Sequence, residues 1–204
     1  LTVTPDDQVR VNMGEPNFEP QQVPFRANKA ENLYLLRVAE QTVMLGAVSM
    51  GNPHLVLFLD QVPSVERVRS LGPRIEGDER FPQRTNVELV HVQDEVLVAR
   101  VWERGSGETM ACGTGACAVL VAANEVGLAP RRAEVRFPGG TVVVERTEEE
   151  VAEGERLTVR WRGGTVVSVE PHAPGLATYA RRRYGGPAPR IAPPGYPRYS
   201  RVDW

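Results

Sequence analysis

Hydrophobic and polar residues alternate over much of the chain up to residue 161, and this two-residue period is typical of β-strands. Residues 3–13 alternate loosely up to Gly14, and residues 54–60 form a compact apolar run of the kind found in buried strands. We predict further strands at residues 33–36, 41–50, 86–91, 95–103, 133–137, 140–146 and 157–161. A turn at 92–95 is expected to join the strands at 86–91 and 95–103 as a hairpin. The chain is therefore expected to be rich in strands.

Two segments have the pattern of helices. In residues 62–77 the apolar residues recur at helical spacing, and Gly72-Pro73 is expected to end this helix. Residues 114–126 are small and apolar without proline, and Gly127 follows them. Because this second segment is apolar almost all round, it predicts a buried central helix. The expected fold is α+β, with a barrel-like, closed or nearly closed sheet wrapped around that helix.

The composition is that of a folded soluble protein, since 41% of the 204 residues are hydrophobic and 25% are charged. The formal net charge of -2 gives no reason to expect nucleic acid or anionic lipid as a partner. No apolar stretch reaches the roughly 18 residues needed to cross a bilayer, and the N-terminus lacks the regions of a signal peptide. We therefore expect a cytoplasmic protein without membrane contact. Because the chain does not begin with Met, we also expect that it starts partway through a longer protein.

Residues 162–204 differ from the rest of the chain, because they are rich in proline, glycine and arginine and hold four of the five tyrosines. Such a segment cannot build a core of its own, so we expect an irregular tail. A basic, aromatic tail is also compatible with nucleic-acid binding, but an irregular end is the favoured interpretation. A frameshift near the end of the gene would explain the same composition.

The two cysteines, Cys112 and Cys117, are expected to be reduced thiols. On one helix they would lie about 140° apart around the axis, which disfavours a disulfide. Neither belongs to a CxxC pair or has a histidine at zinc-ligand spacing. Cys117 lies inside the apolar helix and is expected to be a small core residue.

Cys112 stands where a glycine-rich turn becomes a helix, in Cys112-Gly113-Thr114-Gly115. The first amides of a helix have no intrahelical acceptors and favour negative charge, so this turn predicts a site for a carboxylate. The same field is expected to favour the thiolate of Cys112 and make it a usable base or nucleophile. Taken alone, however, such a turn is weak evidence, and a buried inert thiol is the commoner case.

Four motifs in a fixed order give this turn a context: GNPHLVLFLD at 51–60, RTNVELV at 84–90, ERGSGET at 103–109 and ACGTGACA at 111–118. In this order they resemble the signature of the diaminopimelate epimerase family, and residues 11–20 resemble the passage between its two domains. Proline racemases and other relatives have different cysteine motifs. The resemblance covers about residues 1–161 and implies one half of the family fold. It assigns 1–26 to the end of a missing N-terminal domain and the crossover, 27–161 to the C-terminal domain and 162–204 to the tail.

The resemblance implies an isomerase that interconverts LL- and meso-diaminopimelate, for lysine and cell-wall synthesis, without pyridoxal phosphate, metal or any other cofactor. In that family one cysteine thiolate removes the α-proton of the amino acid, and a second cysteine thiol protonates the opposite face. Cys112 would be one of this pair. Glu103 would tune its proton affinity, and His54 would lie beside the other cysteine.

The same resemblance implies a set of substrate-binding residues. It places the distal amino and carboxylate groups of the substrate near Asn52, Asn86, Glu103 and Arg104. An arginine can bind a carboxylate bidentately, which suits a diacid. The amides of Gly113 and Thr114 would hold the reacting α-carboxylate, onto which charge moves as the proton leaves. Without the resemblance these residues have plainer roles as turn formers or as a solvated charge pair.

The chain departs from the family at the second cysteine, because it contains no second catalytic cysteine motif. Cys117 cannot reach the opposite face of the substrate from inside the helix that bears Cys112. We therefore predict that this chain alone does not catalyse epimerisation and needs the missing N-terminal half; the resemblance also suggests a homodimer. A non-catalytic amino-acid-binding fragment and a related cofactor-independent racemase are the alternatives.

Overall fold

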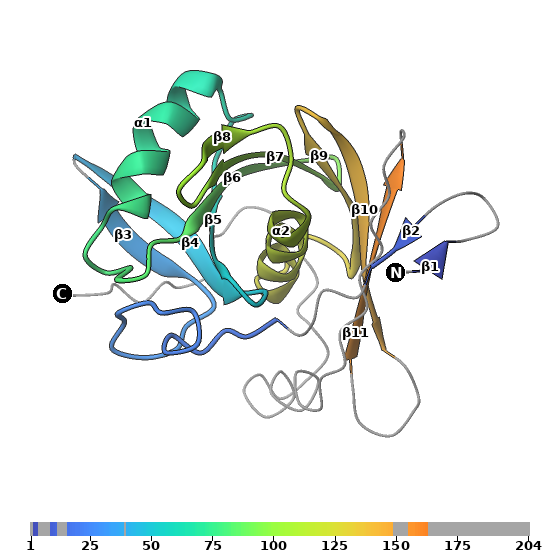
Figure 1. Ribbon diagram of the computed structural model, residues 1–204, viewed down its shortest axis with the longest axis horizontal. Coiled ribbons are helices and arrows are strands. Elements are labelled where there is room, and N and C mark those ends of the chain that lie inside the picture. The colour runs from blue at the N-terminus through green and yellow to red at the C-terminus, as the bar shows by residue number, and fades with distance from the viewer. Residues whose placement is uncertain (1, 4–8, 12–15, 39, 149–154, 163–204) are drawn as a thin grey trace.

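The computed structural model describes residues 2–3, 9–11, 16–38, 40–148 and 155–162, and these residues form a curved main sheet, a small two-stranded sheet and two helices (Figure 1). Apart from Arg162, the predicted tail lies outside the described residues. The strands are β1 (Thr2–Val3), β2 (Val9–Arg10), β3 (Tyr34–Val38), β4 (Gln41–Ser49), β5 (Pro53–Phe58), β6 (Asn86–Gln93), β7 (Val96–Glu103), β8 (Gly107–Thr109), β9 (Arg132–Phe137), β10 (Gly140–Glu148) and β11 (Glu155–Arg162). The helices are α1 (Val65–Glu76) and α2 (Gly113–Glu125). Neither helix among the described residues has the length and apolar character that crossing a bilayer would require.

The main sheet contains nine of these strands, in the order β11-β10-β9-β7-β6-β5-β4-β3, with β8 paired to β7. Most neighbours are antiparallel, but β5 and β6 are parallel, as are β7 and β9. Each parallel pair is joined through a helix, α1 for the first and α2 for the second. The prediction of an α+β, strand-rich fold is thus confirmed.

The sheet does not close into a barrel, so the predicted closure is wrong. In the described residues the edge strands β3 and β11 do not pair with each other. Figure 1 shows the sheet curving around α2, which packs against β4, β5, β6, β7, β9 and β10. The alternating pattern along the strands fixes which side chains face inward, but closure also needs the two edges to meet with a matching stagger. A curved open sheet and a barrel therefore share the same pattern.

Apolar cores lie on both faces of the sheet. On β5, Val56 belongs to the cluster around α2, whereas Leu55 and Leu57 belong to the cluster that contains the buried face of α1. This explains the compact apolar run in the sequence, because a strand buried on both faces does not alternate. Within α2 the residues from Gly115 to Ala123 are all buried, which confirms the predicted central helix.

Helix α1 does not end at Gly72-Pro73 as predicted but continues to Glu76. Ser64 caps its start by accepting a hydrogen bond from the Arg67 amide at 3.2 Å. Pro73 lies in the last turn, where its missing N–H costs a single hydrogen bond. Gly72 packs so closely that a Cβ there would lie 2.5 Å from Trp102 Cγ. This contact with β7 holds the last turn in place.

The predicted hairpin is confirmed, with β6 and β7 joined by a tight turn. Asp94 and Glu95 have positive φ angles of 48° and 65°, and a two-residue loop of this kind suits the right-handed twist of the strands on either side. The short strand β8 was not predicted. It folds the 103–109 motif back on β7, and the positive φ angles of Gly105 and Gly107, 76° and 88°, allow this reversal.

Candidate active site

Cys112 is the N-cap residue of α2, with extended backbone angles of -138° and 122°. Its sulfur accepts a hydrogen bond from the Gly115 amide at 3.3 Å and lies 3.4 Å from Thr114 Oγ1. The residue is 9% exposed, so it lies at the edge of the core cluster rather than in open solvent. The sequence prediction that Cys112 stands at the beginning of a buried helix is therefore confirmed.

The protonation of Cys112 differs from the prediction. Burial, followed by the negative charge of Glu88, raises the pKa of the Cys112 thiol to about 11. Hydrogen bonds from Thr114 and Gly115 lower this pKa, but by less, and Glu103 raises it further. The helix terminus does not make Cys112 a thiolate, because desolvation and nearby carboxylates outweigh the amide. At neutral pH Cys112 holds its proton.

Cys117 is fully buried, and its S–H donates to the carbonyl oxygen of Gly113 at 3.2 Å. Burial raises the pKa of this thiol well above its usual value. Both cysteines are free, which confirms the predicted absence of a disulfide between them. Cys117 is the small core residue that the sequence predicted.

His54 and Asn52 connect β5 to the Cys112 turn. The ring of His54 is completely buried, and its Nε2 lies 2.9 Å from Asn52 Oδ1. The Asn52 amide nitrogen in turn lies 3.5 Å from Thr114 Oγ1, the hydroxyl that contacts the Cys112 sulfur. The structure thus brings four predicted site residues into one chain of contacts. These contacts connect His54 to Cys112 itself, whereas the resemblance associated His54 with the second cysteine.

Asn86 joins two other segments of the site. Its side-chain nitrogen donates to the Pro53 carbonyl at 2.9 Å, and its Oδ1 accepts from the Arg104 amide at 2.9 Å. Asn86 therefore ties the beginning of β5 to the loop that follows β7. The Arg104 side chain is exposed and donates to the Gln83 carbonyl at 3.2 Å. Among the described residues no carboxylate pairs with Arg104.

Glu103 ends β7 with a partly buried carboxylate. It accepts a hydrogen bond from Thr109 Oγ1 at 2.5 Å, which closes the β7-β8 turn. Its charge contributes to the raised pKa of Cys112, so it acts on that thiol through space. Gly113 and Thr114 form the first turn of α2 and are partly exposed. Their backbone amides remain candidates for holding a carboxylate.

Two carboxylates in this region were missed by the sequence analysis. Glu88, on β6, is 0% exposed, and its Oε1 lies 2.7 Å from His54 Nδ1. It stands within the apolar run NVELV, where a charge on a buried strand was a visible signal. Glu76, at the end of α1, accepts from Trp102 Nε1 and from the Gly105 amide, each at 2.8 Å. No local pattern marks Glu76, because both donors come from β7 and its loop.

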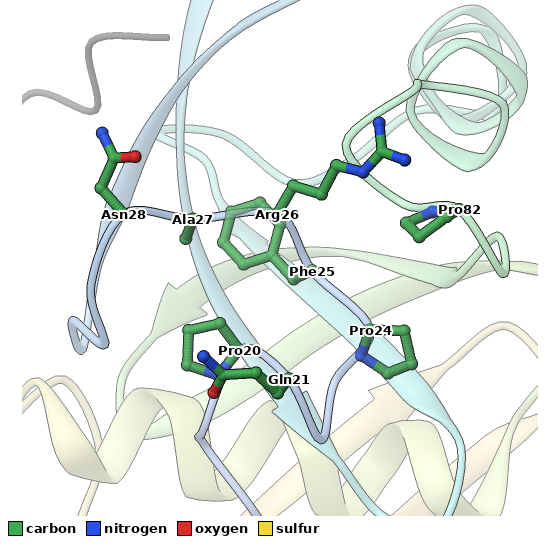
Figure 2. A pocket seen from close by; sticks show the side chains of 8 residues that line it. All are labelled: Pro20, Gln21, Pro24, Phe25, Arg26, Ala27, Asn28 and Pro82. Atoms are coloured by element: carbon green, nitrogen blue, oxygen red, sulfur yellow. The ribbon is translucent and has the colours of Figure 1, made fainter.

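A separate surface pocket lies in the segment before β3. Figure 2 shows its lining, which consists of Pro82 from the loop before β6 and residues that precede β3: Pro20, Gln21, Pro24, Phe25, Arg26, Ala27 and Asn28. None of these residues belongs to the Cys112 set. The pocket is therefore not the place where the predicted chemistry is assembled.

Comparison with known proteins gives a family match and similarity to solved structures. Residues 46–160 match the model of the family described as diaminopimelate epimerase. A crystal structure of a phenazine biosynthesis protein of the PhzF family from Bacillus anthracis is similar at 16% identity with a TM-score of 0.42. That similarity covers 53% of this chain and 34% of the other. The family match includes all four motifs and more than half of the 204 residues, and the chain belongs to the diaminopimelate epimerase family.

Proposed function

We propose that this chain is part of an isomerase that interconverts LL- and meso-diaminopimelate without a cofactor, and that it supplies the acid/base group for one face of the substrate α-carbon. The proposal is supported by the family membership and carried by one observation, the Cys112 thiol at the start of α2 in contact with Thr114. In such a reaction a base takes the α-proton, and the electron pair of the broken C–H bond spreads into the adjacent carboxylate. An acid then forms a new C–H bond on the opposite face.

Cys112 suits the acid role in the state described here. With a pKa of about 11 the thiol holds its proton at neutral pH and can deliver it to an α-carbanion. In the reverse direction the same sulfur, having lost its proton, takes the α-proton back. The partner group of opposite role would come from the N-terminal half, since Cys117 donates into its own helix.

The substrate would bind around this thiol. The amides of Gly113 and Thr114 lie in the first helical turn, where amides lack intrahelical acceptors, and would hold the α-carboxylate. The exposed Arg104 guanidinium would pair with the distal carboxylate, and Asn52 and Asn86 would fix the remaining polar groups. Glu103 would tune Cys112 through its charge. Residues 27–161 would form the C-terminal domain, and residues 1–26 the connection to the other half.

Exchange of the substrate α-proton with heavy water tests this proposal. We expect no exchange from the isolated chain, and exchange after addition of a separately produced N-terminal half that carries the second cysteine. Cys112→Ala should abolish the reconstituted exchange, while Cys117→Ala, on the same helix, should retain it. Turnover by the isolated chain would refute the need for a second half, and exchange by the Cys112→Ala protein would refute the role of the thiol.

A second candidate is an amino-acid-binding fragment without catalysis. It is favoured by the presence of only two cysteines in the chain, one of which is sealed in the core. Calorimetric titration with diaminopimelate separates the two. Binding that Arg104→Ala weakens and Arg136→Ala leaves unchanged, without any proton exchange in the reconstituted protein, would favour the fragment. Arg136 is a suitable control because it is an exposed arginine on β9.

A further inference from the structure

Glu88 occupies a position where a charge is costly. It lies on β6 with 0% exposure, and its side chain reaches the helix α2 so closely that a Cβ on Gly115 would lie 2.7 Å from Glu88 Oε1. Its Oε2 is buried and has no hydrogen-bond partner among the described residues. An isolated buried carboxylate is strongly disfavoured unless it is paired or neutralised. The His54 ring, 2.7 Å from Oε1, is the available partner.

The His54 ring is placed between two oxygen acceptors. Its Nδ1 faces Glu88 Oε1 at 2.7 Å, and its Nε2 faces Asn52 Oδ1 at 2.9 Å. A neutral imidazole carries one N–H, so it can donate to one of these oxygens and not to both. If Glu88 were ionised and His54 neutral, one contact would set a nitrogen lone pair against an oxygen lone pair. With Asn52 Oδ1 facing the ring, these contacts require one more proton than that state contains, whereas a reversed Asn52 amide would accommodate a neutral Nδ1–H ring.

We propose that Glu88 is a positioning residue that shares this extra proton with His54 and thereby fixes the Asn52 amide beside Cys112. The proton makes His54 an imidazolium opposite the Glu88 carboxylate. In this arrangement Nε2 donates to Asn52 Oδ1. The amide nitrogen of Asn52 then points to Thr114 Oγ1, 3.5 Å away.

The consequence for Cys112 is geometric and electrostatic. A continuous line of contacts runs from Glu88 on β6 through His54 and Asn52 to Thr114, whose hydroxyl lies 3.4 Å from the Cys112 sulfur. The groups that face this sulfur are Glu88 from β6, Glu103 from β7, and the Thr114 hydroxyl and Gly115 amide of α2. The two carboxylates favour the thiol. The positioning role rests on the proposed function, whereas the shared proton does not.

The shared proton can be measured directly by ¹⁵N NMR of the histidine rings in the full chain at neutral pH. His54→Gln assigns the His54 signals, and His91, whose Nδ1 lies 3.0 Å from the Leu59 carbonyl, serves as an internal reference. We expect an imidazolium signal for His54 together with an ionised Glu88 carboxylate signal in ¹³C spectra. A neutral His54 ring of either tautomer would overturn the proposal. The protonation state is read from the unsubstituted protein, and the variant serves only to assign the signal.

The effect on Cys112 is measured by its alkylation rate in a Cys117→Ala background. Glu88→Gln removes the charge and keeps the shape, so we expect faster alkylation, by about tenfold for each unit by which the thiol pKa falls. Glu134→Gln, on β9, is the matched control and should leave the rate unchanged. An unchanged rate in Glu88→Gln would overturn the electrostatic part. Neither readout requires turnover, so failure here and failure of the proposed function are distinguishable.

Discussion

Gly115 is the position where the fold and the candidate site constrain each other most directly. An added Cβ would lie 2.7 Å from Glu88 Oε1, 3.1 Å from Cys112 Cβ and 3.3 Å from the Cys112 sulfur. The carboxylate cannot swing away without leaving His54, which holds it at 2.7 Å. Gly115→Ala should therefore push α2 away from β6 or break the Glu88–His54 contact.

Two opposing terms set the magnitude of this change. Alanine is favoured over glycine inside a helix by about 1 kcal/mol, so the substitution would stabilise the chain if space were available. Overpacking of a filled core costs about 1–3 kcal/mol. The sum is a net loss of up to about 2 kcal/mol in the free energy of unfolding. Gly77→Ala is the matched control, since its Cβ would lie 3.3 Å from a single carbonyl oxygen and its φ of -90° suits any residue.

Urea unfolding followed by circular dichroism measures both variants. The sharper test repeats Gly115→Ala in a Glu88→Ala background, where the clash with the carboxylate is absent. We expect the loss to shrink or become a gain, with a coupling of about 0.5–3 kcal/mol between the two sites. If Gly115→Ala instead stabilises the protein by about 1 kcal/mol in both backgrounds, the proposed close contact between α2 and Glu88 is wrong.

Three further substitutions test other parts of the structure. Burial alone would raise the pKa of the Glu76 carboxyl, but hydrogen bonds from Trp102 and Gly105 hold this pKa below its usual value. The stability that the Glu76 carboxylate contributes is therefore present above pH about 4.5 and is lost as the pH falls through the lower folded pKa. Glu76→Gln should make the free energy of unfolding depend less on pH in that window. Asn86→Ala removes both bonds that join β5 to the Arg104 loop and should cost about 1–3 kcal/mol in urea unfolding, and an unchanged midpoint would show that these bonds are dispensable. In native protein iodoacetamide should label Cys112 slowly and Cys117 only after unfolding, as mass spectrometry would reveal, and labelling of native Cys117 would contradict its sealed position.

The sequence predicted those elements whose causes are local. Helix α2 follows from a run of small apolar residues between Cys112 and Gly127, and the hairpin follows from two apolar strands around Asp94 and Glu95. The true end of α1 was not predictable in this way. It depends on Trp102, which packs on Gly72 from a strand 30 residues further along the chain. The open edges of the sheet are likewise a property of the assembled strands and not of any one of them.

The candidate site also has features that local sequence predicts and features that depend on contacts between distant segments. The motifs identified Asn52, His54 and Cys112, and the structure brings these residues into one set of contacts. The direction of the Cys112 pKa shift was predicted wrongly, because the sequence shows the helix terminus but not the burial or the two carboxylates that oppose it. Glu88 reaches this thiol from β6, and its partner His54 comes from the neighbouring strand β5.

Three positions on three elements depart from what core packing alone would favour. A histidine at position 54, a carboxylate at 88 and a bare glycine at 115 replace apolar side chains at sites with 0% exposure or inside a buried helix. Each is unfavourable by itself: a buried ion pair commonly gives no more stability than apolar residues of similar volume, and glycine weakens a helix. In the proposed arrangement they depend on one another, because Gly115 makes room for Glu88, Glu88 pairs with the His54 ring and His54 contacts Asn52. Selection for stability alone does not favour this set, whereas the proposed role of a fixed polar group beside the Cys112 thiol would favour it.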